Sequence, residues 1–224
     1  MRGRLAITLL AALGLVSGVA LATHDERNLN TANPVRALPR PPLGVNDLDE
    51  LASPPVPERV RLGRWLFFDT RLSADGRVSC ATCHVPERAF SNDTRVARGA
   101  GRRAGVRKTP SFVNVAHTFV PNRFGWDGRA GSLEEQSLFP VANPVEMAST
   151  PSRMVRTLTR IAGYAEYFQR AFGDPAITPG RVASALADYQ RTRMSGNSAW
   201  GPLGSRRRSG TLAVCPAWMG VVHR

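Results

Sequence analysis

Three kinds of pattern are missing from this sequence of 224 residues. No segment alternates apolar and polar residues for long enough to predict a β-sheet. No internal repeat is present, which argues against a repeat architecture. The aromatic residues, 7% of the chain, are not interleaved with the basic residues in the way that single-strand nucleic-acid binding uses. We therefore expect no nucleic-acid partner.

The formal net charge of +13 is concentrated partly at the two ends of the chain. Six arginines and no acid lie in residues 1–22 and 201–224, so the remainder carries +7. A dense basic run in the middle can attract anions or form a solvated loop, and we interpret it as a loop. This run consists of Arg98, Arg102, Arg103, Arg107 and Lys108.

The first 22 residues have the features of a cleaved export signal. Arg2 and Arg4 form a basic start, and the apolar residues 5–19 are too few to span a bilayer comfortably. Residues 20–22 form a small-x-small cleavage site, and polar residues follow at once. An uncleaved membrane anchor is the alternative. We predict a signal peptide over 1–22 and a mature protein in the periplasm.

Behind the signal, composition divides the chain into three parts. Residues 23–56 lack steady periodicity and are expected to form an extended N-terminal arm. Residues 57–200 are long enough for one domain with its own core. Residues 201–224 contain no periodicity, and we interpret them as a disordered tail translated out of frame after a frameshift near Trp200. A genuine divergent tail is the alternative.

The strongest chemical signal is a pentapeptide. Cys80 and Cys83 are three residues apart, and His84 follows directly. Two thiols at this spacing can add to the two vinyl groups of one porphyrin, and the histidine then lies under the iron plane. We expect one covalently bound haem c with His84 as an axial ligand of the iron. A redox-active dithiol is the alternative, which His84 and the export signal disfavour.

A simple electron carrier would need a second axial ligand. His117 is the other internal histidine, and the sequence also offers several methionines. A surface role for the histidine and a core role for the methionines are better supported than ligation. The sequence therefore favours an open sixth position on the iron.

Helical periodicity predicts a mainly α fold, a cytochrome c-like helical haem domain with long irregular loops. A Gly- and Arg-rich loop is expected over residues 91–109, and a tight turn at Asp75-Gly76. The predicted helices cover residues 57–68, 133–138, 152–172 and 179–194.

A series of short motifs follows in one order along the chain. They occupy residues 62–69, 71–73, 75–76, 80–84, 108–111, 113–115, 125–129, 133–136, 143–147 and 195–198. In content and order they resemble the N-terminal, peroxidatic haem domain of bacterial di-haem cytochrome c peroxidases, over about residues 58–198. The second haem domain of that family is missing.

The resemblance implies roles for two residues. In the family a glutamate lies on the distal side of the first haem, which implies this position for Glu146. A tryptophan lies between the two haems, which implies this position for Trp126. A carboxylate above the iron can take the proton from hydrogen peroxide and return it to the departing oxygen. Arg129 can pair with a haem propionate, although a surface salt bridge is an equally good interpretation. Without the resemblance, Glu146 would be read as a helix-entry carboxylate and Trp126 as a core aromatic.

Two further departures from the family matter. Members that need reductive activation carry a distal histidine where this chain has Ala100 or a neighbouring glycine or arginine, which implies a haem without a gating ligand. An asparagine that binds calcium in the family corresponds to Lys108, and a cation there argues against a bound calcium ion.

These observations lead to a hypothesis and an alternative. The chain is expected to be a periplasmic cytochrome c peroxidase, complete or truncated, that reduces hydrogen peroxide to water. Its electrons would come from a small donor protein such as a cytochrome c or a cupredoxin. The alternative is a monohaem electron-transfer protein without catalytic turnover. A related variant resembles the di-haem enzymes that oxidise tryptophan residues of a partner during cofactor maturation. The sequence leaves open whether a homodimer forms.

Overall fold

The computed structural model describes residues 31, 33–43, 45–117 and 123–196. The predicted signal peptide and the predicted tail lie outside the described residues. Clustering of contacts separates residues 1–37 from residues 38–224, and every element named below belongs to the second unit. Of the predicted arm, residues 34–42 form neither helix nor strand, and the short 3-10 helix η1 covers Leu48–Glu50.

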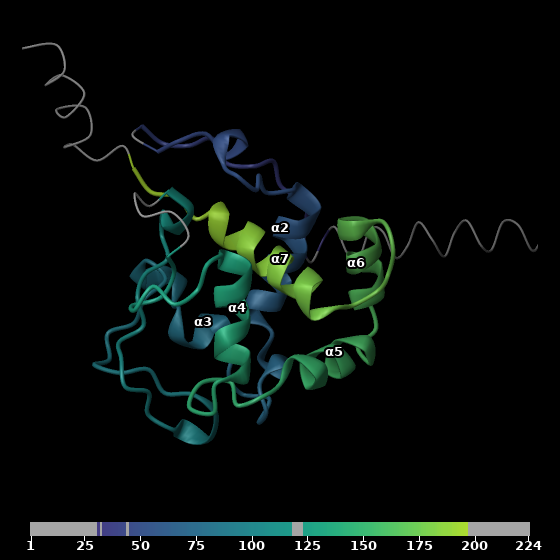
Figure 1. Cartoon of the computed structure of the whole chain (residues 1–224). Helices are drawn as coiled ribbons and strands as arrows, with labels where there is room; N and C mark the ends of the chain where they lie inside the picture. The colour runs from purple at the N-terminus through teal and green to yellow at the C-terminus, as the bar shows by residue number, and fades with distance from the viewer. Residues whose placement is uncertain (1–30, 32, 44, 118–122, 197–224) are drawn as a thin grey trace, which may run out of the picture. The chain divides into compact units, whose positions relative to one another are not determined.

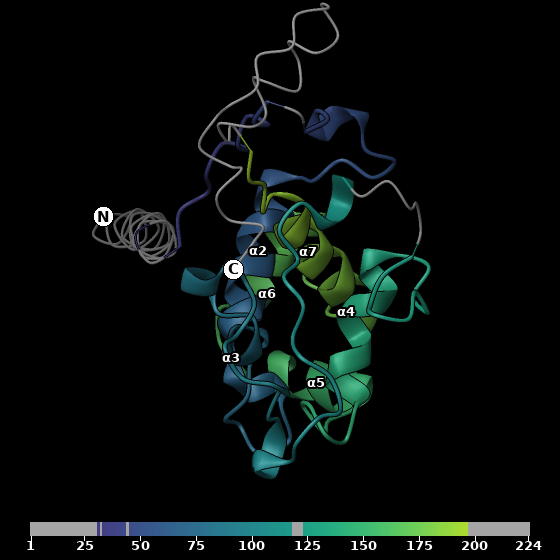
Figure 2. The same ribbon diagram turned by 90° about the vertical axis from the view of Figure 1, so that its left-hand side faces the viewer.

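Helices α2 (Pro57–Phe68) and α7 (Pro179–Arg191) lie side by side, as Figures 1 and 2 show. Both begin with a proline at the first turn, where the missing N–H has no helical partner to lose. At their crossing a Cβ on Gly63 would lie 1.9 Å from the Ala185 carbonyl oxygen. Only glycine permits this close approach of the two backbones. The bounds predicted for α2 are confirmed, whereas α7 ends at Arg191 and not at residue 194.

Three more helices pack with this pair: α4 (Leu133–Ala142), α5 (Pro151–Thr159) and α6 (Tyr164–Phe172). We call the five helices α2, α4, α5, α6 and α7 the helical frame. The fully buried apolar side chains of the frame include Leu62, Leu66, Met154, Leu158, Phe168 and Val182. Burial of this apolar area is the main stabilising contribution in the frame.

Two more predicted helices were wrong in their extent. The helix expected over 152–172 is two helices, because Gly163 adopts a φ of 95° that an α-helix does not allow. The helix expected to end at residue 138 continues to Ala142 through Pro140. Because Pro140 lies in the last turn, it removes a single helical hydrogen bond, while Val141 becomes buried against the frame.

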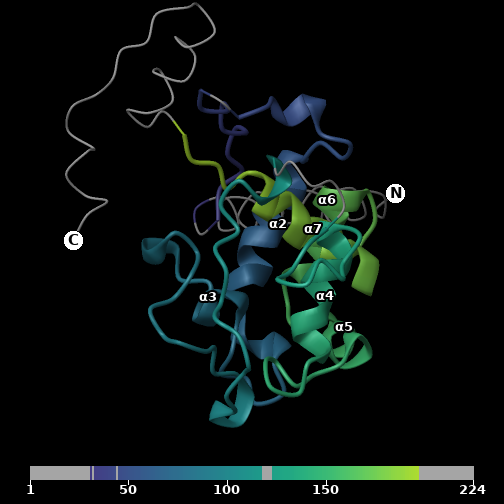
Figure 3. The ribbon, with the colours of Figure 1, turned by 60° about the vertical axis from the view of Figure 1, so that its left-hand side comes forward.

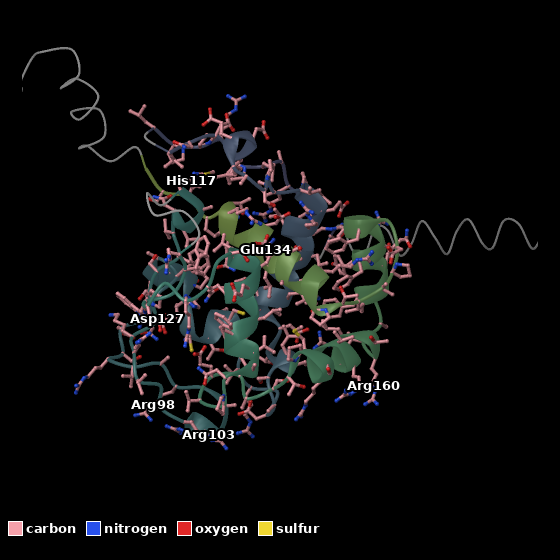
Figure 4. The ribbon with its side chains drawn as sticks, viewed as in Figure 1. Arg98, Arg103, His117, Asp127, Glu134 and Arg160 are labelled. Atoms are coloured by element: carbon pink, nitrogen blue, oxygen red, sulfur yellow. The ribbon has the colours of Figure 1, made fainter. Side chains whose placement is uncertain are left out.

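A buried ion network ties α2, α4 and α7 together. Asp188 of α7 is 1% exposed and accepts from Arg59 Nε at 2.7 Å and from Arg191 Nη1 at 2.9 Å. Arg191 also reaches Glu134 Oε1 of α4 at 2.7 Å, and Figure 4 labels Glu134 beside α7. Each of these charges is paired, which offsets its desolvation.

We call residues 73–131 the loop region. It lies on one side of the α2–α7 pair, and α5 and α6 lie on the other, as Figures 1 and 3 show. Its four helices are short: α3 (Cys80–Cys83), η3 (Pro86–Arg88), η4 (Ala100–Arg102) and η5 (Val115–His117). In the described ranges the β-structure is limited to isolated bridges, and none of them extends into a strand. The predicted mainly α fold is therefore confirmed.

None of the helices within the described ranges is long and apolar enough to cross a membrane.

Candidate haem site

Helix α3 holds both candidate attachment cysteines in one turn. The turn starts at Ser79, whose backbone N–H donates to Thr82 Oγ1 at 2.9 Å. It ends at His84, whose backbone N–H donates to the Cys80 carbonyl at 2.9 Å. This hydrogen bonding explains why so short a helix forms at all, since isolated helical turns are otherwise unfavourable. Cys80, Cys83 and His84 are thereby brought together as predicted.

The thiols of Cys80 and Cys83 are free and half-buried. Burial raises the pKa of the Cys80 thiol to about 12, and burial also raises the pKa of Cys83. Both are therefore protonated at neutral pH. Redox-active dithiols instead have a lowered pKa on the attacking cysteine. The environment of the pair thus fits covalent attachment better than dithiol exchange.

The His84 ring is oriented by a backbone carbonyl. Its Nδ1 lies 2.8 Å from the Phe90 carbonyl oxygen, which can only accept a hydrogen bond. Nδ1 therefore carries the proton, and the lone pair of Nε2 remains for a metal. Burial lowers the pKa of His84, which keeps the ring neutral. The carbonyl is aimed by a tight turn in which Ala89 and Phe90 have φ values of 52° and 56°.

An aromatic cluster lies against the His84 ring, which its member Phe112 contacts. The Phe112 ring centroid lies 5.2 Å from that of His84, 4.6 Å from that of Phe90 and 5.6 Å from that of Phe67. Such a wall suits the apolar face of a porphyrin and excludes water. Phe90 and Phe112 were not predicted, because neither belongs to a sequence motif that connects it to the pentapeptide.

The candidate distal carboxylate lies on a tight turn that directly follows α4. We call this turn, residues 143–148, the Glu146 knuckle. Burial raises the pKa of Glu146, although a hydrogen bond from Asn143 and the charge of Arg129 oppose the rise. The charge of Glu146 in turn raises the pKa values of Cys80 and Cys83. Glu146 therefore lies within electrostatic reach of the attachment thiols, and the structure brings it together with α3.

Residues 98–100 connect α3 to the Glu146 knuckle. The Arg98 carbonyl oxygen lies 4.0 Å from Cys83 Sγ, and the Ala100 N–H donates to the Glu146 carbonyl at 2.6 Å. Gly99 lies between them, and a Cβ on Gly99 would be 2.2 Å from the backbone carbonyl oxygen of Glu146. Ala100, one of the positions at which the resemblance predicts the absence of a gating histidine, is buried and its methyl side chain offers no ligand. The neighbouring basic side chains are exposed, as expected for a solvated loop, and Figure 4 shows Arg98 and Arg103 at the periphery.

Trp126 and Arg129 lie at the surface near this site. The Trp126 side chain is 62% exposed, which contradicts a core role, and its Nε1 donates to the Lys108 carbonyl at 2.8 Å. The Arg129 guanidinium lies 3.6 Å from Asp127 Oδ1 and 5.4 Å from the ring centroid of Phe139. Its charge reaches Glu146. A partnership of Arg129 with a haem propionate stays a prediction.

His117 is not brought to α3. It belongs to η5, which contacts the C-terminal part of α7, and Figures 2 and 4 show this segment apart from α3. This placement does not favour His117 as a second axial ligand. Together, the free thiol pair, the oriented imidazole, the aromatic wall and the nearby carboxylate fit a covalently attached haem.

Comparison with known proteins gives a consistent result. The family model described as di-haem cytochrome c peroxidase matches residues 57–205. The methylamine utilization protein MauG of Methylorubrum extorquens is 42% identical over 183 residues, which cover 81% of this chain and 50% of MauG. The cytochrome c551 peroxidase of Pseudomonas aeruginosa is 37% identical over 153 residues, which cover 66% of this chain and 43% of that protein.

Solved structures show the same similarity. A MauG-like protein associated with microbial copper homeostasis superposes with a TM-score of 0.60 at 28% identity, over 79% of this chain and 49% of that one. The diheme peroxidase BthA from Burkholderia thailandensis superposes with a TM-score of 0.55 at 27% identity, over 70% and 45%. The chain thus spans about half the length of the proteins that it matches.

Proposed function

Because the chain belongs to the di-haem cytochrome c peroxidase family, we propose that it reduces hydrogen peroxide to water at one haem c attached to Cys80 and Cys83. His84 Nε2 would be the axial ligand of the iron. Each peroxide takes up two electrons and two protons and gives two waters. The electrons would come from a small donor protein such as a cytochrome c or a cupredoxin, in the periplasm.

The observation that carries this proposal is the half-buried Glu146 carboxylate, which lies within electrostatic reach of the attachment helix. Haem, when bound, supplies a centre that binds peroxide and transfers electrons. The protein must then move a proton from one peroxide oxygen to the other. Burial raises the pKa of Glu146 above its ordinary value, which suits a group that accepts a proton and gives it back. Glu146 Oε1 accepts from Asn143, which leaves Oε2 for this proton.

The geometry around His84 supports the same function. The Phe90 carbonyl holds the imidazole through Nδ1 and increases the electron density at Nε2. The aromatic cluster of Phe67, Phe90 and Phe112 keeps water from that side. Peroxide would therefore react on the side of the haem away from His84, and we propose that Glu146 acts on that side.

A spectroscopic experiment tests the proposal. The optical and paramagnetic resonance spectra of the purified ferric protein are recorded before and after one equivalent of hydrogen peroxide, for the wild type and for Glu146→Gln. We expect a high-spin signal that disappears on addition of peroxide in the wild type, and disappears at least about 100-fold more slowly in the variant. A low-spin haem that is inert to peroxide would contradict the proposal and favour an electron-transfer protein.

The exposed Trp126 favours a second candidate function, the oxidation of a partner protein. A tryptophan that is 62% exposed and hydrogen-bonded to the backbone of Lys108 is well placed to pass electrons between the site and a docked protein. Trp126→Phe distinguishes the two functions. It should leave the reaction of the ferric protein with peroxide unchanged, and should slow the subsequent oxidation of a protein substrate.

A further inference from the structure

The Glu146 knuckle is built around the side chain and the carbonyl of Asn143. Asn143 ends α4, and its carbonyl accepts from the backbone N–H groups of Glu146 at 3.0 Å and Ala148 at 2.9 Å. Its Oδ1 accepts from the Val145 N–H at 3.1 Å, and its Nδ2 donates to Glu146 Oε1 at 2.6 Å. One residue therefore fixes both the backbone of the knuckle and the carboxylate that it carries.

The orientation of the Asn143 amide follows from its partners. The Val145 N–H can only donate, so the atom that faces it must be the oxygen Oδ1. The NH2 group must then face Glu146, where it donates to a carboxylate oxygen. Because both ends of the amide are engaged, the side chain cannot flip without losing two hydrogen bonds.

The backbone of Glu146 is held independently of this amide. The Ala100 N–H donates to the Glu146 carbonyl at 2.6 Å, and Gly99 packs against the same peptide. What these backbone contacts leave undetermined is the direction of the carboxylate at the end of its side chain. The Asn143 amide determines that direction.

We propose that Asn143 is a positioning residue for the reaction with peroxide, because its amide engages Oε1 of Glu146 and presents Oε2 to the reacting proton. This inference rests on the proposed function of Glu146. Asn143 belongs to the sequence motif of residues 143–147, and no role was predicted for it from the sequence.

Several other groups act on the Glu146 carboxylate and have to be considered in any titration. Arg129 lies within electrostatic reach and lowers its pKa. The thiols of Cys80 and Cys83 on α3 face it, and both would be thioethers once haem is attached. Arg103, from the segment packed on the knuckle, donates to the Pro144 carbonyl at 3.0 Å. None of these groups is altered by a change at Asn143.

The test uses Asn143→Asp in the haem-loaded protein. Aspartate keeps the oxygen that accepts from Val145 and replaces the donor to Glu146 with a second carboxylate oxygen. Two carboxylates at this distance share a proton, so the pKa of the pair should rise by at least about one unit. We expect the acid limb of the rate of reaction with peroxide to move up by at least about one pH unit. At pH values below the acid limb, the variant should react with peroxide about tenfold more slowly than the wild type, and its rate should recover at higher pH.

The second readout does not depend on turnover. The infrared carbonyl stretch of protonated Glu146, assigned by its absence in Glu146→Gln, is titrated in the ferric protein without peroxide. In Asn143→Asp the pH midpoint of this titration should rise by the same amount as the acid limb of the rate. Asn143→Ala removes the donor without adding charge, and should raise the midpoint in the same direction by a smaller amount.

The matched control is Asn114→Asp. The Asn114 amide also bridges a backbone N–H and a carbonyl, those of Ser195, at 2.8 Å each, and these contacts do not involve the Glu146 knuckle. In this variant the infrared titration of Glu146 should have the same midpoint as in the wild type. Infrared midpoints of Glu146 that are unchanged in both Asn143 variants would overturn the inference. A wild-type rate in Glu146→Gln would instead overturn the proposed function, and the infrared titration would still decide the role of Asn143.

Discussion

The helical frame and the loop region are stabilised by different interactions. The frame buries apolar side chains at helical spacing and adds the ion network of Asp188, Arg59 and Arg191. The loop region has few buried apolar side chains and is held by hydrogen bonds between side chains and backbone, such as Ser91 Oγ to the Thr109 carbonyl at 2.7 Å. Stability is concentrated in the first, and the candidate site lies mostly in the second.

Backbone strain follows the same division. All non-glycine residues with positive φ in the described ranges belong to the loop region or the Glu146 knuckle: Ala89, Phe90, Arg102, Asn114 and Ala148. Two of them aim the carbonyl that orients His84. Strained conformations persist only where the surroundings determine them, and they cluster at functional sites. The comparison teaches that the frame provides the stability that lets the loop region hold a strained site.

The largest expected effect comes from removing the attachment. In Cys80→Ala/Cys83→Ala, no haem should remain on the protein after denaturing electrophoresis. A haem would contribute much of the packing of the loop region, so amide hydrogen exchange there should accelerate roughly tenfold or more, while α2 and α7 remain protected. Equal acceleration in α2 and α7 would show that the two regions do not differ in this way.

The next largest effect is expected in the frame. Asp188→Asn leaves Arg59 and Arg191 without their shared carboxylate, and the free energy of unfolding in urea should fall by about 3–5 kcal/mol. Asp174→Asn is the control, since Asp174 pairs with Arg181 nearer the solvent and this change should cost clearly less than Asp188→Asn. A loss below about 1 kcal/mol in Asp188→Asn would mean that the network does not hold the frame.

The same substitution at two glycines compares the regions directly. Gly63→Ala places a Cβ 1.9 Å from a backbone oxygen of α7 and should cost about 3 kcal/mol in the free energy of unfolding. Gly99→Ala places a Cβ 2.2 Å from the Glu146 carbonyl oxygen and should displace the knuckle. We expect it to slow the reaction with peroxide about tenfold with a smaller loss of stability. The reverse pattern would contradict the division between the regions.

The smallest effect is expected at the Asp69 cluster below α2. Tyr164 Oη donates to Asp69 Oδ2 at 2.6 Å, and Arg71 binds the same carboxylate. Burial raises the pKa of Asp69, but the hydrogen bonds from Arg71 and Tyr164 outweigh it, so the pKa lies below its ordinary value. Tyr164→Phe should cost about 1.5 kcal/mol at pH 7.

The pH dependence of that loss follows from its sign. A carboxylate with a lowered pKa stabilises the fold at pH values above its unfolded pKa, and the stabilisation disappears as the pH falls through the folded pKa. The difference between Tyr164→Phe and the wild type should therefore narrow below about pH 4, where Asp69 takes up a proton. The free energy of unfolding in urea is measured for both proteins. A difference between them that stays constant from pH 7 to pH 3 would contradict this account.

Local patterns sufficed for the parts of the molecule whose interactions are local. The bounds of α2 were predicted correctly, because its apolar spacing and Pro57 are both features of one short segment. The grouping of Cys80, Cys83 and His84 was predicted for the same reason. Two of the three errors in helix length, at Gly163 and Pro140, arose where packing against the rest of the frame decided the outcome over local preference.

By itself the sequence determined the family, the attachment pentapeptide and the mainly helical fold, because each is written in contiguous residues or in their spacing. Only the tertiary structure decided which distant groups meet at the site. Phe112 packs against the His84 ring, and Gly99 lets the chain pass against Glu146. Such contacts depend on the path of long loops, and no periodicity encodes that path.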